Sequence, residues 1–99
     1  MPKELLAPEY RKHLNTTFRS SLENGQVVSF ELFEVADRIG PAGYESFSLM
    51  FRAPNDTPRL QRIFRLEHDV MPTSDVFLVP ISQNEKGIVF EAAFNRRID

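Results

Sequence analysis

The chain has 99 residues, 41 % of them hydrophobic and 26 % charged, which is the size and composition of one folded domain with a single core. Its formal net charge of −2 argues against a general nucleic-acid binder, because affinity for the phosphate backbone comes mainly from Lys and Arg. The absence of Cys excludes disulfides, thiolate nucleophiles and thiolate metal sites.

The first third of the chain predicts a short helix followed by two strands. Pro8–Leu14 has Pro in its first turn, an acid near its start and bases toward its end, as helices do. Thr17–Leu22 favours a strand, and the dipeptide Asn24-Gly25 is typical of a tight reversal. The next strand is predicted at Val27–Ala36.

The apolar alternation of this second strand changes phase. Val28, Phe30 and Leu32 share one parity, whereas Phe33 and Val35 continue the apolar series on the other. One extra residue re-aims every later side chain of a strand, so the change predicts a β-bulge or a barrel corner.

The middle of the chain predicts two further strands between loops rich in Gly and Pro. A loop at Arg38–Gly43 precedes the strand Glu45–Arg52, and a loop at Ala53–Pro58 follows it. The next strand is Ile63–Val70, and its core face is predicted to carry Phe64, Leu66, His68 and Val70.

The last quarter reads as a hairpin. Val76–Ile81 and Ile88–Asn95 are apolar on more than one face, and Gln83–Lys86 joins them in a turn. We therefore expect this hairpin to close the core.

These elements predict one all-β domain over residues 1–99, with a short helix at 8–14 and antiparallel strands within 17–96. An open meander of six strands leaves two unpaired edges, so we predict closure into a small barrel, with a two-layer sandwich as the alternative. In the barrel, the strand Thr17–Leu22 is expected to pair with the last strand.

Four segments carry a family resemblance: Phe47–Pro54, Phe64–His68, Phe77–Pro80 and Phe90–Arg96. They resemble a family of small bacterial domains of unknown function that share Phe-Ser-Leu-x-Phe-Arg-x-Pro, Phe-Leu-Val-Pro and Glu-Ala-x-Phe-Asn motifs. The chain departs from that pattern where Pro72 stands in place of a glycine. The resemblance implies a compact β domain with a structural or adaptor role. It also implies an association with phage-tail-like proteins.

His68 is the first candidate site residue. On an extended strand its neighbours Glu67 and Asp69 point to the opposite face, so they do not orient its ring as a catalytic triad or a metal site requires. The prediction is a buried histidine hydrogen-bonded to backbone or a polar neighbour, and the alternative is a residue in a binding pocket. His13 lies far away in sequence, so no metal site is expected.

The second group of candidates is a set of arginines around one loop, Arg52, Arg59, Arg62 and Arg65. Alternation with acids favours a solvated face of mixed sign. The functional alternative is a cationic patch for an acidic protein partner, because interfaces favour the planar donor fork of Arg.

Glu91 and Asn95 are the polar candidate residues of the last strand that need an explanation. A carboxylate beside Val89 and Ala93 should pair with Arg52 or Arg65 or accept backbone hydrogen bonds. Ala92 and Ala93, small on opposite faces, suggest close approach of another strand or subunit.

No catalytic residue or cofactor is predicted, because no serine stands in Gly-x-Ser-x-Gly and four glycines form no phosphate-binding loop. We expect a non-enzymatic interaction or structural domain with a protein partner or self-association. The alternatives are a small-molecule or peptide-binding barrel with a pocket near His68, and a small hydrolase or isomerase. A longest apolar run of six residues and a start without an apolar leader predict a cytoplasmic protein with no membrane partner.

Overall fold

The computed structural model describes residues 7–38 and 44–97. The predicted loop Arg38–Gly43 lies outside the described residues except for Arg38. The elements, in chain order, are α1 (Ala7–Arg11), β1 (Thr17–Ser21), β2 (Val27–Arg38), β3 (Tyr44–Ala53), β4 (Arg62–Leu66), β5 (Ser74–Asn84) and β6 (Gly87–Arg97).

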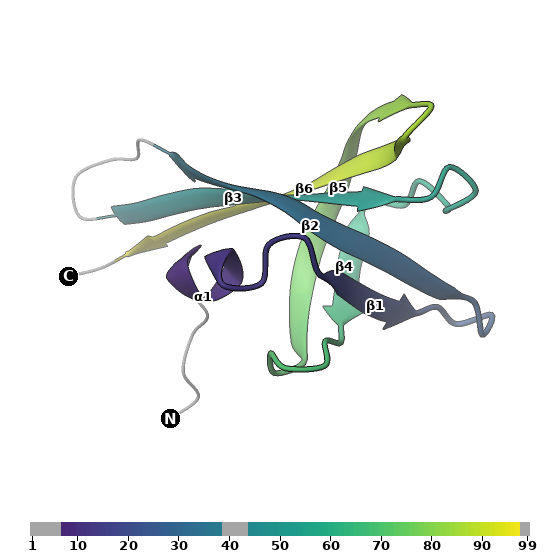
Figure 1. Ribbon diagram of the computed structural model, residues 1–99, viewed down its shortest axis with the longest axis horizontal. Coiled ribbons are helices and arrows are strands. Elements are labelled where there is room, and N and C mark those ends of the chain that lie inside the picture. The colour runs from purple at the N-terminus through teal and green to yellow at the C-terminus, as the bar shows by residue number, and fades with distance from the viewer. Residues whose placement is uncertain (1–6, 39–43, 98–99) are drawn as a thin grey trace.

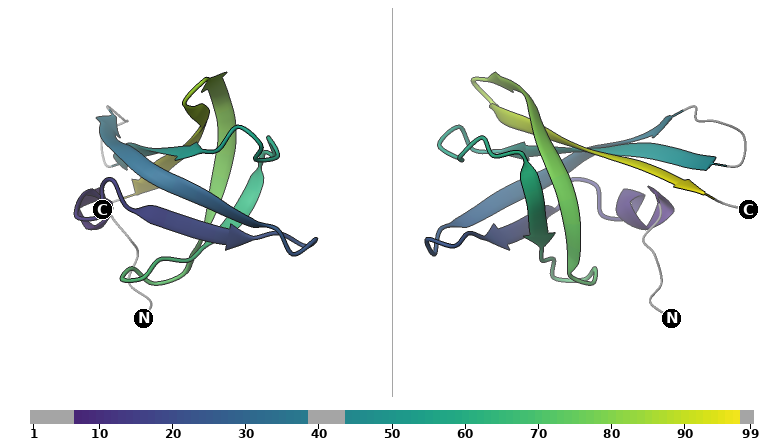
Figure 2. Two further views of the ribbon diagram at one scale, coloured as in Figure 1. Left: turned by 45° about the vertical axis from the view of Figure 1, so that its right-hand side comes forward. Right: turned by 180° about the vertical axis from the view of Figure 1, so that it is seen from behind.

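The six strands form one antiparallel sheet that curls into a nearly closed barrel (Figures 1 and 2). The strand order is β1-β2-β3-β6-β5-β4, so two three-stranded meanders meet where β3 pairs with β6. The barrel closes where β1 meets β4: the Arg19 N–H donates to the Glu67 carbonyl (2.8 Å) and the Glu67 N–H to the Arg19 carbonyl (2.7 Å).

The predicted all-β barrel with a short helix is therefore confirmed. The expected pairing of Thr17–Leu22 with the last strand is wrong. The reason is the long ladder between β3 and β6, from Tyr44 paired with Arg97 to Ala53 paired with Ile88. This ladder places β6 in the middle of the sheet and leaves β4 as the free edge that meets β1.

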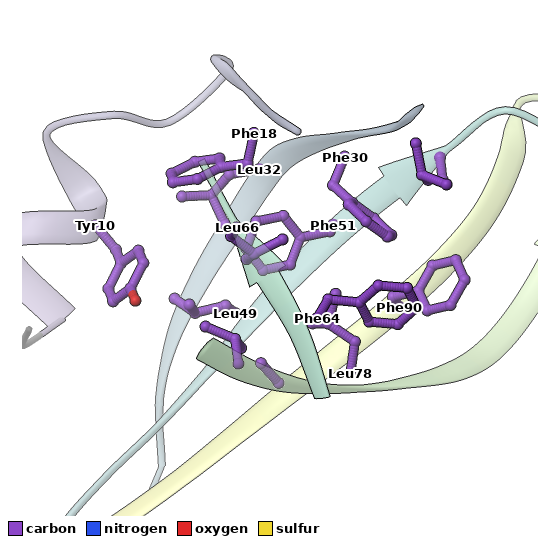
Figure 3. Close-up of a cluster of buried hydrophobic side chains, with 14 of the residues drawn as sticks. Tyr10, Phe18, Phe30, Leu32, Leu49, Phe51, Phe64, Leu66, Leu78 and Phe90 are labelled. Carbon is purple, nitrogen blue, oxygen red and sulfur yellow. The ribbon is translucent and has the colours of Figure 1, made fainter. Parts of the chain in front are cut away.

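Phenylalanine rings fill the barrel (Figure 3). The Phe30 ring centroid lies 5.2 Å from those of Phe64 and Phe90 and 6.2 Å from that of Phe51, all in edge-to-face geometry. Each of the four side chains is at most 2 % exposed. Edge-to-face packing of this kind adds to the hydrophobic free energy of burial.

The predicted β-bulge is confirmed in β2. The pairing with β3 shifts between Leu32 and Glu34, so Phe33 is the extra residue and Val35 returns to the inner face, opposite Leu49. A second shift between Pro80 and Ser82 makes Ile81 the extra residue of β5. Bulges bend strands, which fits their place in a closing sheet.

The fourth strand is shorter than Ile63–Val70. β4 ends at Leu66, and Val70, predicted to face the core, is 74 % exposed. The chain leaves the sheet here because the His68 side chain accepts the N–H groups of Val70 and Met71.

Helix α1 lies against the part of β2, β3 and β6 that extends beyond the barrel (Figures 1 and 2). Its Tyr10 is 2 % exposed, and its ring packs near Phe18, Phe47 and Phe94. Burial raises the pKa of the Tyr10 phenol, and a hydrogen bond with Ser74 opposes this shift. Within the described ranges, no helix is long and apolar enough to cross a membrane.

Candidate functional site

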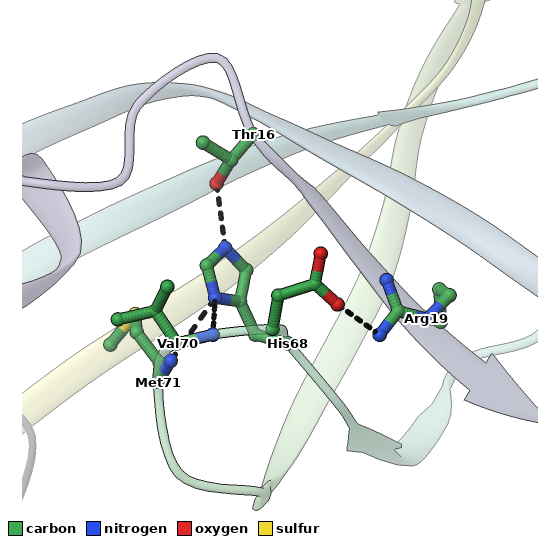
Figure 4. Close-up of polar contacts among 6 residues, drawn as sticks. Thr16, Arg19, His68, Val70 and Met71 are labelled. Carbon is green, nitrogen blue, oxygen red and sulfur yellow. Dashed lines mark hydrogen bonds and ion pairs between the residues drawn. The ribbon is translucent and has the colours of Figure 1, made fainter.

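His68 lies close to the seam of the barrel, where β1 meets the end of β4, and both of its ring nitrogens form hydrogen bonds (Figure 4). Its Nδ1 accepts the backbone N–H groups of Val70 (3.0 Å) and Met71 (3.1 Å), and its Nε2 lies 2.9 Å from the Thr16 Oγ1. The Thr16 hydroxyl donates to the His13 carbonyl at 2.6 Å. Nδ1 is therefore the unprotonated nitrogen, and Nε2–H donates to Thr16.

The two histidines, distant in sequence, are neighbours in the fold. The ring centroids of His13 and His68 are 4.9 Å apart, and that of Phe18 is 4.4 Å from His68. Because His13 and His68 are far apart in sequence, no local pattern could have shown this contact. In the described part of the chain, no group of three or more His, Cys, Asp or Glu residues is placed to hold a metal ion.

Both ring nitrogens of His68 are engaged in hydrogen bonds within the chain. The hydrogen bonds predicted for His68 are present, but its side chain is only half-buried, whereas the sequence predicted a buried one. Three surface hollows have linings that are fully described, and His68 lines none of these three.

The surroundings of His68 favour its neutral form. Burial lowers the pKa of His68 most, the neighbouring His13 and Arg19 lower it further, and Asp69 opposes them. Asp69 is itself paired with Arg19, whose Nη2 lies 2.9 Å from its Oδ1. An imidazole whose pKa lies below 6.5 in the folded protein binds fewer protons than it does in the unfolded chain, so its contribution to stability is present above about pH 6.5 and is lost as the pH falls below that value.

We expect the free energy of unfolding to fall between pH 7.5 and pH 5.5, and His68→Asn to reduce this slope. The Asn side-chain oxygen can take the place of Nδ1 as acceptor for the Val70 and Met71 N–H groups, but it does not titrate. Urea unfolding of both proteins across this pH range is the measurement. Equal slopes in the two proteins would rule out His68 as the titrating group.

The four arginines predicted to cluster each have a different partner within the chain. Arg62 binds Glu23 through two hydrogen bonds (2.6 and 3.0 Å), and the Arg65 Nε lies 3.5 Å from Asp75. The Arg59 guanidinium donates to the Gln83 side chain at 2.9 Å. Arg52 is different, since its guanidinium carbon lies over the Phe33 ring, 4.3 Å from the centroid.

Two ion pairs connect the β1 and β4 sides of the barrel across the seam. They are Arg19–Asp69 and Arg62–Glu23. The hydrogen bonds with Arg62 lower the pKa of Glu23 to about 2. Sequence reasoning missed Glu23 because nothing local links it to Arg62.

Of the two polar candidates in β6, Asn95 has a hydrogen-bond partner across the sheet, whereas Glu91 has apolar neighbours on both adjacent strands. Asn95 accepts a hydrogen bond from the Ser46 hydroxyl (2.6 Å) across the β3–β6 ladder. Glu91 stands between Met50 and Val79 in the sheet. Among the residues with described side chains, no ion pair joins Glu91 to Arg52 or Arg65, so that expected pairing is wrong.

The outside of the barrel carries an apolar strip that we call the outer apolar face, made of Ile63, Phe77, Val79 and Ile81. Ile63 and Phe77 are directly opposite each other in the β4–β5 pairing, and they are 59 % and 51 % exposed. Ile81, at the β5 bulge, is 48 % exposed. The sequence showed that both faces of this strand were apolar but assigned them to the core.

A family model described as a domain of unknown function, DUF6916, matches residues 6–94. Comparison with curated proteins and with solved structures found no match. The matched segment covers α1, β1 to β5 and most of β6, and the chain therefore belongs to the DUF6916 family of domains of unknown function.

Proposed function

We propose that this domain is a non-enzymatic structural component that self-associates through the outer apolar face. The observation that carries the proposal is the pair Ile63 and Phe77, opposite in register and both more than half exposed. Large aromatic and aliphatic side chains gathered on one exposed surface are typical of interface centres.

The charges beside this face favour a second copy of the chain as its occupant. Arg65 and Asp75 form the next pair on the same face of this ladder, with side chains 73 % and 61 % exposed and an N–O distance of 3.5 Å. A surface with an apolar centre and both signs of charge side by side can complement itself under a two-fold rotation, because each Arg then meets the Asp of the other copy.

The proposal of a non-enzymatic role is supported by the contacts of the polar candidate residues. Both nitrogens of His68 are hydrogen-bonded, and three of the four clustered arginines are held by partners within the chain. No contact of the described residues supports the two alternatives, a binding pocket near His68 and a small hydrolase or isomerase. A role in a phage-tail-like assembly, which the resemblance implies, is one setting for such a component and stays a prediction.

Light scattering after size-exclusion chromatography tests the proposal. We expect a dimer with a dissociation constant on the order of tens of micromolar, typical of a small interface. Phe77→Ser should make the chain monomeric over the same concentration range. The matched control is Val27→Ser, which changes a side chain that is 57 % exposed at the start of β2, outside the outer apolar face, and should leave the dimer intact.

Two results would overturn the proposal. One is a wild-type chain that stays monomeric at millimolar concentration. The other is equal loss of the dimer in Phe77→Ser and Val27→Ser, because the contact would then not be centred on the outer apolar face.

A further inference from the structure

A hollow of about 440 Å³ opens on the outside of β1, β2 and β3, beside the β5–β6 turn. Its lining combines the polar or charged residues Thr17, Ser29, Glu31, Arg52 and Lys86 with the apolar residues Ala53 and Pro54. Thr17, Glu31 and Arg52 form one row across three strands, because each is directly opposite the next in the strand pairing.

Arg52 is the cation that the fold holds in place without neutralising it. Its guanidinium stacks on Phe33, the extra residue of the β2 bulge. Across the described residues, Arg52 forms no hydrogen bond and no ion pair, whereas Arg59, Arg62 and Arg65 each have a polar partner. The contact with the Phe33 ring positions the guanidinium without using its N–H donors.

The turn that carries Lys86 packs directly against Arg52. Gly87 approaches β3 so closely that an added Cβ would lie 2.4 Å from the Ala53 carbonyl oxygen and 3.1 Å from the Arg52 Cγ. The Lys86 N–H donates to the Asn84 Oδ1 at 2.8 Å, which fixes the turn. The close approach that Gly87 allows therefore places Lys86 and Arg52 in the lining of the same hollow.

The other polar groups of the hollow are also free. Within residues 7–38 and 44–97, no side-chain partner is found for Lys86 or for the hydroxyls of Thr17 and Ser29. Glu31 is opposite Arg52 in register but is not ion-paired with it. Two cations and one carboxylate leave the hollow with a net charge of +1.

We propose that this hollow binds a carboxylate side chain of an acidic peptide segment in a partner protein. The planar fork of Arg52 matches the two oxygens of a carboxylate, and Lys86 adds the second positive charge. A net charge of +1 suits a monoanion, whereas Glu31 repels a dianionic phosphate and can accept an N–H group of the peptide. The site is separate from the outer apolar face and does not depend on self-association.

The test is an NMR titration of the folded chain with acetyl-tetraglutamyl-amide. Amide shifts are expected at Ser29, Glu31, Arg52 and Lys86. Arg52→Gln and Arg52→Lys should each weaken binding by about tenfold, since neither offers the planar fork, and Lys86→Ala by about threefold. Arg65→Gln is the matched control, because it removes one positive charge from a different part of the barrel and should leave the affinity unchanged.

The Arg52 variants lose the contact with Phe33 and could unfold for that reason. Lys86→Ala then still tests the proposal, because Lys86 lies in an exposed turn and its loss should not affect folding. Three results would overturn the proposal: equal shifts with acetyl-tetraglutaminyl-amide, tighter binding of inorganic phosphate than of the glutamyl peptide, or the same loss of affinity in Arg65→Gln as in Arg52→Gln. The last would mean a general attraction of the surface for anions.

Discussion

Gly87→Ala is expected to lower the free energy of unfolding by about 3 kcal/mol or more. Gly87 has a φ of 139°, a backbone conformation that residues with a Cβ rarely adopt. A Cβ there would also lie 2.4 Å from the Ala53 carbonyl oxygen, which is backbone and cannot move aside without distorting the end of β3. Urea unfolding followed by circular dichroism measures the loss.

Gly25→Ala is the matched control. Gly25 also has a positive φ, 87°, but no atom lies within 4 Å of the position of an added Cβ. Only the backbone conformation is then strained, and the expected cost is about 1 kcal/mol. Equal costs at the two glycines would mean that the close approach to Ala53 contributes nothing.

Phe30→Ala should destabilise the protein by about 4 kcal/mol, as expected for removal of a fully buried ring. Phe30 is 0 % exposed and contacts the rings of Phe51, Phe64 and Phe90 on three other strands. Because a small domain has a total stability of only about 5–15 kcal/mol, the variant should be close to unfolding at room temperature. The midpoint of urea unfolding is the measurement.

The same substitution at an exposed ring gives the control for Phe30. Phe77→Ala removes a side chain that is 51 % exposed and leaves no internal cavity, so its cost should stay below about 1 kcal/mol. If Phe77→Ala proved as damaging as Phe30→Ala, Phe77 would belong to the core and the outer apolar face would lose its central residue.

The pattern of apolar residues predicted most of the local structure. The predicted strand Glu45–Arg52 corresponds to β3, and the alternating side chains of Phe47, Leu49 and Phe51 along it are fully buried. The change of parity at Phe33 predicted the bulge, and Asn24-Gly25 predicted the first hairpin, in which Gly25 has a φ of 87°. These signals depend on neighbours along the chain, which is why the sequence contains them.

The candidate site was predicted only in part. His68 was expected to find hydrogen-bond partners and has them, whereas the bond between Asn95 and Ser46 was not predicted. The proximity of His13 to His68 and the pairing of Arg62 with Glu23 join residues from distant parts of the chain. No spacing in the sequence could show these contacts.

By itself, the sequence determined the strands, the bulge, the first turn and the phenylalanine core, because side-chain alternation and backbone preference act over a few residues. Only the tertiary structure decided that β6 lies beside β3, that β1 closes on β4, and that Phe77 faces solvent while Arg52 stays unpaired. Several strand orders bury the same phenylalanines, and the choice among them depends on long-range pairing of whole strands, which also decides which polar side chains meet.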